Sequence, residues 1–244
     1  MCRFSETSRV RLGNVVMYIA AHAKYPYKTE VLKLLYLMEE RMVQKYHVPM
    51  LSIPFSVWRL GPVSVDVFEE LSDGPVLLGD FITLQFNRWS SDGHPCTHED
   101  GRVATEVDVV NGQGIKVIPN REFDADEFSD TELQVMREVM ERYGQMNSEE
   151  LIAETHKEGS LWRETAKEHG LLEDFEQKRA NSSPVIIDMA RFLSSSAREY
   201  YEETMETRET SNMVRLGHVY AQDDMTPDEL YQVIAQDIDA IYAE

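Results

Sequence analysis

The stretch that decides the fold begins VLKLLYLMEERMVQKY at Val31 and ends VDVFEEL at Leu71. From residue 31 to residue 38 every position except Lys33 is apolar or aromatic, so a helix here is apolar on nearly every face. Such a helix is buried inside a domain. Glu39-Glu40-Arg41 interrupts the apolar run, which is too short to cross a bilayer. We therefore predict a central core helix over residues 29–46.

The second half of the stretch predicts a turn followed by a short helix. Trp58-Arg59-Leu60-Gly61-Pro62 follows an extended run, predicted as a short edge strand over residues 55–58. Gly61 can adopt backbone angles that other residues avoid. Pro62 suits the first position of a helix, where its missing N–H costs nothing. Apolar residues at spacings of four then predict an amphipathic helix over residues 62–72.

Composition limits the class of protein. The chain has 244 residues with 44 acidic and 24 basic side chains, a formal charge of −20. This charge argues against a phosphate-binding surface over most of the chain and suits a basic partner. The basic N-terminal residues lack interleaved aromatics, so nucleic-acid binding is not favoured. Two cysteines, no signal peptide and no transmembrane segment predict a cytoplasmic protein without a membrane partner.

The rest of the chain predicts an α+β fold, a mainly helical domain with a small antiparallel β insertion. Helices are expected at residues 9–23, 129–144, 147–157 and 161–169. The second of these begins with a capping-box sequence, Ser129-Asp130-Thr131-Glu132. The β insertion covers about residues 79–119, with a strand at 81–86 and a hairpin of 103–110 with 115–118. We expect a domain over residues 1–177 and a helical, acidic C-terminal extension over 178–244. In that extension residues 178–184 read as a linker, and helices are expected over 185–201 and after Thr226.

Chemistry-bearing motifs are sparse. His94, Cys96 and His98 are residue types that bind zinc, but they lie in a polar loop without a second ligand cluster, so they are only weak metal candidates. No phosphate loop and no nucleophile motif is present. His156 lies in a polar group at a helix end, where a structural bond to a freed carbonyl is favoured over proton transfer. The sequence therefore predicts no catalytic residue and no cofactor.

Two blocks of the sequence resemble the Panacea domain, also called the SocA-like antitoxin domain. The first block is Lys33-Leu34-Leu35-Tyr36-Leu37, followed by Trp58-Arg59 and Gly61-Pro62-Val63. The second is a helix ending in Tyr143-Gly144, then Thr155-His156 before Gly159 and Trp162. The resemblance covers about residues 10–170. Within it, Lys33, Tyr36, Trp58, Arg59, Gly61, Pro62, His156 and Trp162 are expected to be structural or partner-binding residues.

The resemblance implies an antitoxin, not an enzyme, that binds a toxin encoded by a neighbouring gene and blocks it. A relative that delivers its toxin to a protease makes a proteolytic adaptor one alternative. An autoregulatory transcriptional repressor is the other, although the charge of −20 counts against it. An acidic face or tail steering a basic toxin is one expected binding mode. Aromatic contacts, with Tyr25, Tyr27 and Trp89 as candidates, are the other.

Overall fold

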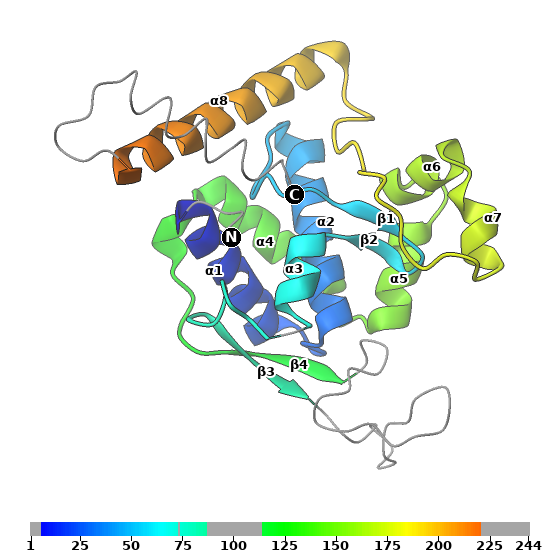
Figure 1. The fold of residues 1–244 in the computed structure, drawn as a ribbon, viewed down its shortest axis with the longest axis horizontal. Helices are drawn as coiled ribbons and strands as arrows, with labels where there is room; N and C mark the ends of the chain where they lie inside the picture. The colour runs from blue at the N-terminus through cyan, green and yellow to red at the C-terminus, as the bar shows by residue number, and fades with distance from the viewer. Residues whose placement is uncertain (1–5, 73, 87–113, 221–244) are drawn as a thin grey trace.

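Helix α2 (Lys28–Tyr46) is the centre of the fold, and Figure 1 shows the other elements of the domain grouped around it. The structure is a computed structural model that describes residues 6–72, 74–86 and 114–220. Helix α2 packs against helices on several sides and against strands from both small sheets. Its residues from Val31 to Glu39 are all buried, which confirms the predicted core helix. The helix ends at Tyr46 and is capped by His47, whose φ of 59° is left-handed.

The other described elements confirm a mainly helical α+β fold. The strands form two separate antiparallel pairs, and most of the helices follow them in the chain. In chain order the elements besides α2 are α1 (Glu6–His22), β1 (Ser56–Trp58), β2 (Gly61–Val63), α3 (Val65–Glu70), β3 (Ile82–Phe86), β4 (Ile115–Pro119), the 3₁₀ helix η1 (Ala125–Glu127), α4 (Asp130–Tyr143), α5 (Ser148–His156), α6 (Leu161–Glu168), α7 (Leu171–Glu176) and α8 (Ser195–Tyr220).

The turn at Gly61 corrects one expectation from the sequence. Pro62 lies in strand β2, opposite Val57 of β1, and not at the first position of a helix. Helix α3 begins later, at Val65, with Ser64 as its N-cap residue. Local sequence favours Pro62 at either place, and the pairing of β2 with β1 decides between them. Gly61 is opposite Trp58 and has a φ of 103°, which matches its predicted role in a tight turn.

The β insertion is built from strands that are far apart in the chain. Strand β4 pairs with β3 along its whole length, from Ile82 opposite Pro119 to Phe86 opposite Ile115. The predicted strand at residues 103–110 lies outside the described residues, so β3 is the partner of β4 that the structure shows. Both strands pack against α1, which makes this sheet part of the domain's core.

The second half of the domain starts from two helix caps. Ser129 caps α4 in a reciprocal capping box with Glu132, as its sequence predicts. Asn147 and Glu150 form a second capping box at α5. Because each pair satisfies backbone N–H groups in the first turn, the start of each helix is defined locally.

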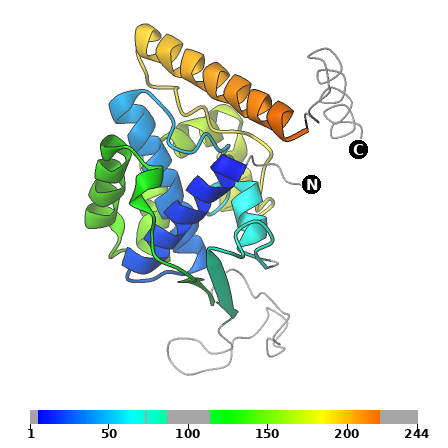
Figure 2. The same ribbon diagram turned by 90° about the vertical axis from the view of Figure 1, so that its left-hand side faces the viewer.

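The segment after α7 is not the helix that its apolar residues suggested. Residues 181–187 run beside β1, where Val57 donates to the Val185 carbonyl and Ile187 donates to the Phe55 carbonyl, both at 2.8 Å. We call residues 181–187 the strap. Helix α8 begins only at Ser195, and in both views it lies on the side of the domain away from β3 (Figures 1 and 2). The helix expected after Thr226 lies outside the described residues.

No helix among the described residues combines the length and the apolar character that crossing a membrane requires.

Glu39 provides a test of what holds the loop after α2. Its buried carboxylate accepts hydrogen bonds from the backbone N–H groups of Met50, Leu51 and Ser52, at 3.2, 2.9 and 3.0 Å. We expect Glu39→Ala to lower the free energy of unfolding by about 2–4 kcal/mol, because three backbone donors, two of them on buried residues, lose their acceptor. Urea denaturation measures this loss, with Glu141→Ala on the exposed face of α4 as control. Equal stability of the two variants would contradict this role for Glu39.

Candidate functional site

Residues that are far apart in the sequence meet at one buried cluster between α2, the β1–β2 pair and the α5–α6 junction. We call it the Lys33 cluster, and its members are Lys33, Trp58, Gly61, Pro62, Thr155, His156 and Trp162. Because the two sequence blocks that suggested a family resemblance supply these residues, the structure brings the predicted motif together at one place.

Lys33 is the centre of the cluster. Its side chain is only 2% exposed, and its ammonium Nζ donates a 2.9 Å hydrogen bond to the Pro62 carbonyl. Burial lowers the pKa of Lys33 to about 7, because a charged amine loses its hydration inside the protein. This bond joins the central helix directly to strand β2.

Gly61 leaves room for Lys33. A Cβ placed on Gly61 would lie 2.9 Å from Thr155 Oγ1 and 3.0 Å from both Cε and Nζ of Lys33. Any larger residue would therefore displace the lysine or the threonine. Both the backbone angle and the crowding require glycine at this position.

His156 and Trp162 form the far side of the cluster. Their rings stack in parallel with centroids 3.6 Å apart, and Trp162 Nε1 donates to the Trp58 carbonyl at 2.9 Å. The pKa of His156 is lowered to about 4, first by burial and then by the positive charges of Lys33 and Arg163. His156 Nε2 is buried and makes no hydrogen bond to any described residue, so this nitrogen does not bond the helix-end carbonyl that the sequence suggested.

Thr155 and Ser160 hold the turn that carries His156. Thr155 Oγ1 donates to the Ile152 carbonyl at 3.0 Å, and Ser160 Oγ donates to the Thr155 carbonyl at 2.7 Å. Ser160 also caps α6 by accepting from the Arg163 N–H. Thr155 belongs to the second block of the family resemblance but was not among the expected site residues, and Ser160 was not singled out. The position of Ser160 between Gly159 and Trp162 is the sequence signal that could have pointed to it.

The contacts within the cluster are packing and hydrogen bonds inside the domain. An amine of lowered pKa beside an imidazole resembles an acid–base pair, but such a pair acts only on a substrate within hydrogen-bond reach. Lys33 and Trp162 are 2% and 3% exposed, so their side chains are packed inside the domain. Lys33 and Trp162 therefore help to fasten α2, the β1–β2 pair and α6 together, whereas Trp58 and His156 are half-buried.

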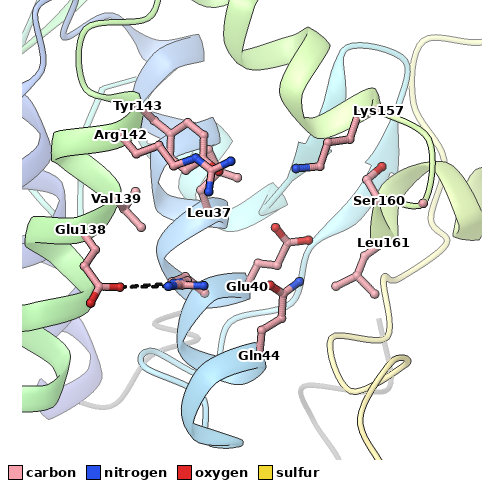
Figure 3. Close-up of a pocket in the computed structure, with 12 residues that line it drawn as sticks. Leu37, Glu40, Gln44, Glu138, Val139, Arg142, Tyr143, Lys157, Ser160 and Leu161 are labelled. Carbon is pink, nitrogen blue, oxygen red and sulfur yellow. Dashed lines mark hydrogen bonds and ion pairs between the residues drawn. The ribbon is translucent and has the colours of Figure 1, made fainter.

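A polar cleft lies on the neighbouring surface, between α2, α4 and the α5–α6 junction. Figure 3 shows Glu40 and Gln44 on its floor, with Arg142 on one side and Lys157 on the other. Its volume of about 180 Å³ is below the roughly 300–1,000 Å³ of typical ligand sites. The cleft is therefore small for a substrate or cofactor site.

Many of the charged side chains around this cleft are already paired with other side chains of the domain. Tyr36 donates to Glu40 at 2.8 Å, and burial raises the pKa of that carboxyl. Glu154 accepts from Tyr143 at 3.0 Å and from Lys157 at 2.6 Å. On the opposite side Glu138 pairs with both Arg41 and Lys45. The Glu138 pairs tie α2 to α4, and the Tyr143–Glu154 bond ties α4 to α5. The Tyr36–Glu40 bond lies within α2.

The remaining predicted residues lie apart from the Lys33 cluster. Arg59 donates to the side chain of Asn181 at 2.7 Å and so anchors the strap. Tyr25 and Tyr27 are both half-buried, and Tyr27 bridges to Lys116 of β4. The candidate contact Trp89 and the weak metal candidates His94, Cys96 and His98 lie outside the described residues. Within the part of the chain that the structure describes, no group of three His, Cys, Asp or Glu side chains is arranged to hold a metal.

Comparison with known proteins gives one match. A family model described as "Antitoxin SocA-like, Panacea domain" matches residues 31–163, more than half of the chain. This range includes every member of the Lys33 cluster. No curated protein and no solved structure matches the chain significantly.

Gly61 allows a matched test of the cluster. We expect Gly61→Ala to lower the free energy of unfolding by about 2–4 kcal/mol more than Gly74→Ala does. Both glycines have a φ near 105°, at 103° and 106°, but a Cβ on Gly74 would meet nothing within 4 Å. The difference between the variants therefore measures the clash with Lys33 and Thr155. Equal losses in chemical denaturation would show that crowding is unimportant.

Lys33 predicts a pH dependence of stability. Its pKa of about 7 in the folded chain is below the ordinary value of 10.5, so between these pH values only the unfolded chain keeps the proton. The free energy of unfolding should therefore rise as the pH increases through this window. Below a pH of about 7 the folded chain carries the full cost of burying a charged Lys33 amine. Lys33→Met should remove that rise, whereas Lys167→Met at an exposed position should keep it. Denaturation at about pH 7 and about pH 9.5 measures it, and identical pH profiles for all three proteins would contradict it.

Proposed function

The chain belongs to the antitoxin SocA-like, Panacea domain family, and from this premise we propose that it is an antitoxin that binds and neutralises a toxin encoded by a neighbouring gene. The family supports a role that is not enzymatic. Neutralisation then consists of binding the toxin directly, without a chemical step on either protein.

The burial of most of the family-motif residues is the observation that carries this proposal. Lys33, Gly61, Pro62 and Trp162 lie inside the domain, so the motif identifies a scaffold. A scaffold held by a buried cluster can keep its fold while its surface changes, because surface substitutions away from special features have small effects on stability. Recognition of a particular toxin would then depend on surfaces outside the motif.

The charge of the chain supports a basic partner. A formal charge of −20 raises the rate at which a cationic protein associates with this chain, and salt screens the attraction. The same charge repels phosphate backbones, so it supports a protein partner over a nucleic acid. We therefore expect association with the toxin to slow as the salt concentration increases.

Co-expression tests the proposal. The reading frame next to this gene should arrest growth when induced alone, and co-expression of this chain should restore growth. The purified pair should also form a complex in size-exclusion chromatography, because the proposed mechanism is direct binding. A neighbouring product that is harmless, or one that still arrests growth beside a well-expressed chain, would overturn the proposal.

The amount of toxin in rescued cells distinguishes neutralisation by binding from delivery to a protease. We expect an immunoblot to show an unchanged toxin level together with restored growth. A toxin level that falls on co-expression, and recovers in a strain without the responsible protease, would replace binding alone with the adaptor mechanism.

A further inference from the structure

Two exposed aromatic side chains flank the start of helix α8. Among the described residues the exposed large hydrophobic side chains are Leu60, Val76, Ile186, Phe192 and Tyr200. Phe192 and Tyr200, each 54% exposed, are the two aromatic members of that set. Aromatic side chains provide large contact areas at little cost in conformational entropy and are enriched at the centres of protein interfaces.

The backbone that carries these aromatics is firmly held. Arg198 pairs with Asp188 at 2.8 Å and with Glu202 at 2.9 Å, so it ties α8 to the turn before it. Ala197 is buried, and Leu193 and Tyr201 pack against the hydrophobic core. The first turns of α8, which carry Tyr200, are therefore fixed to the domain, and a partner would not have to order this backbone on binding.

Carboxylates lie along one side of Tyr200 on α8. Glu199, Glu203 and Glu206 recur along α8 at the spacing of one helix face, and all three are exposed. Over residues 195–207 the basic side chain is Arg198, which is already paired with Asp188 and Glu202. The exposed surface of this part of α8 thus combines an aromatic anchor with negative charge.

We propose that Phe192, Tyr200, Glu199 and Glu203, which we call the α8 face, form the surface that docks a basic face of the toxin. This inference rests on the proposed antitoxin function and assigns it a location. Tyr200 and Phe192 enter apolar pockets of the partner, and the two carboxylates meet its Lys and Arg side chains.

Charge complementarity selects this occupant over others. A second copy of the chain would bring a like-charged face against the carboxylates, which is unfavourable for a homodimer through this face. An anionic membrane surface and a nucleic acid are attracted by Lys and Arg. The Arg side chains next to this face, Arg191 and Arg198, are already paired with carboxylates. A cationic protein satisfies both the aromatic and the acidic parts of the surface.

Binding of the protein product of the adjacent reading frame tests the α8 face. With the full-length chain we expect Phe192→Ala/Tyr200→Ala to weaken the equilibrium Kd by about 30-fold or more, as loss of interface anchors does. Glu199→Lys/Glu203→Lys should slow association and reduce its salt dependence, because two steering charges are reversed. The matched controls are Val76→Ala, at a position 87% exposed, and Glu122→Lys in an exposed loop. Circular dichroism and thermal midpoints confirm that all four variants are folded.

The outcomes separate the two proposals. Wild-type binding, together with weakened binding by both α8 variants and unchanged binding by the controls, supports the α8 face. A second outcome is that the wild-type chain binds the product and rescues growth, but the Kd of both α8 variants stays within about threefold of the controls, the range of ordinary surface effects. This outcome overturns the α8 face and leaves the antitoxin function standing. A wild-type chain that neither binds the product nor rescues growth overturns both.

Discussion

The hydrogen bond from the buried Lys33 amine to the Pro62 carbonyl is the interaction on which the middle of this fold depends. A helix buried on nearly every face cannot send a lysine to solvent, so the amine needs an acceptor inside the protein. The β1–β2 turn supplies that acceptor, and Gly61 is small enough to let the turn approach. Thr155 closes the same space from α5. One buried polar group thus fixes the relative positions of three segments that the chain separates widely.

Local rules explain how much of this architecture the sequence could predict. Apolar periodicity located α2, and cap chemistry located the start of α4, because both signals lie within a few residues. Pro62 was misplaced because its partner strand determines its conformation, and a local pattern does not contain that partner. The strap was expected to be a linker followed by helix for the same reason, since its hydrogen bonds go to β1. The role of Glu39 in capping the loop at residues 50–52 is also visible only in three dimensions.

The same difference between signals in the sequence and long-range contacts applies to the residues of the candidate site. Lys33, Gly61, His156 and Trp162 could be named from the sequence because the family resemblance marks them, although their convergence required the fold. The sequence could not show which aromatic side chains are exposed enough to contact a partner. Tyr25 and Tyr27 are half-buried, whereas Phe192 and Tyr200, which the sequence did not distinguish, are more than half exposed. Exposure depends on which face of each segment packs against the domain, and that is a property of the whole fold.

The strap also completes a sheet that the family-matched region leaves open. The N–H groups of Val57 and Arg59 point away from β2 and bond to Val185 and Asn181, which lie beyond the match at residues 31–163. A fragment cut after α7 would therefore carry β1 as a bare edge strand, with Ile187 no longer covering the apolar side chains beside it. Bare edges recruit strands from other chains, so such a truncation invites aggregation. The practical boundary of an expressible domain consequently lies past Ile187.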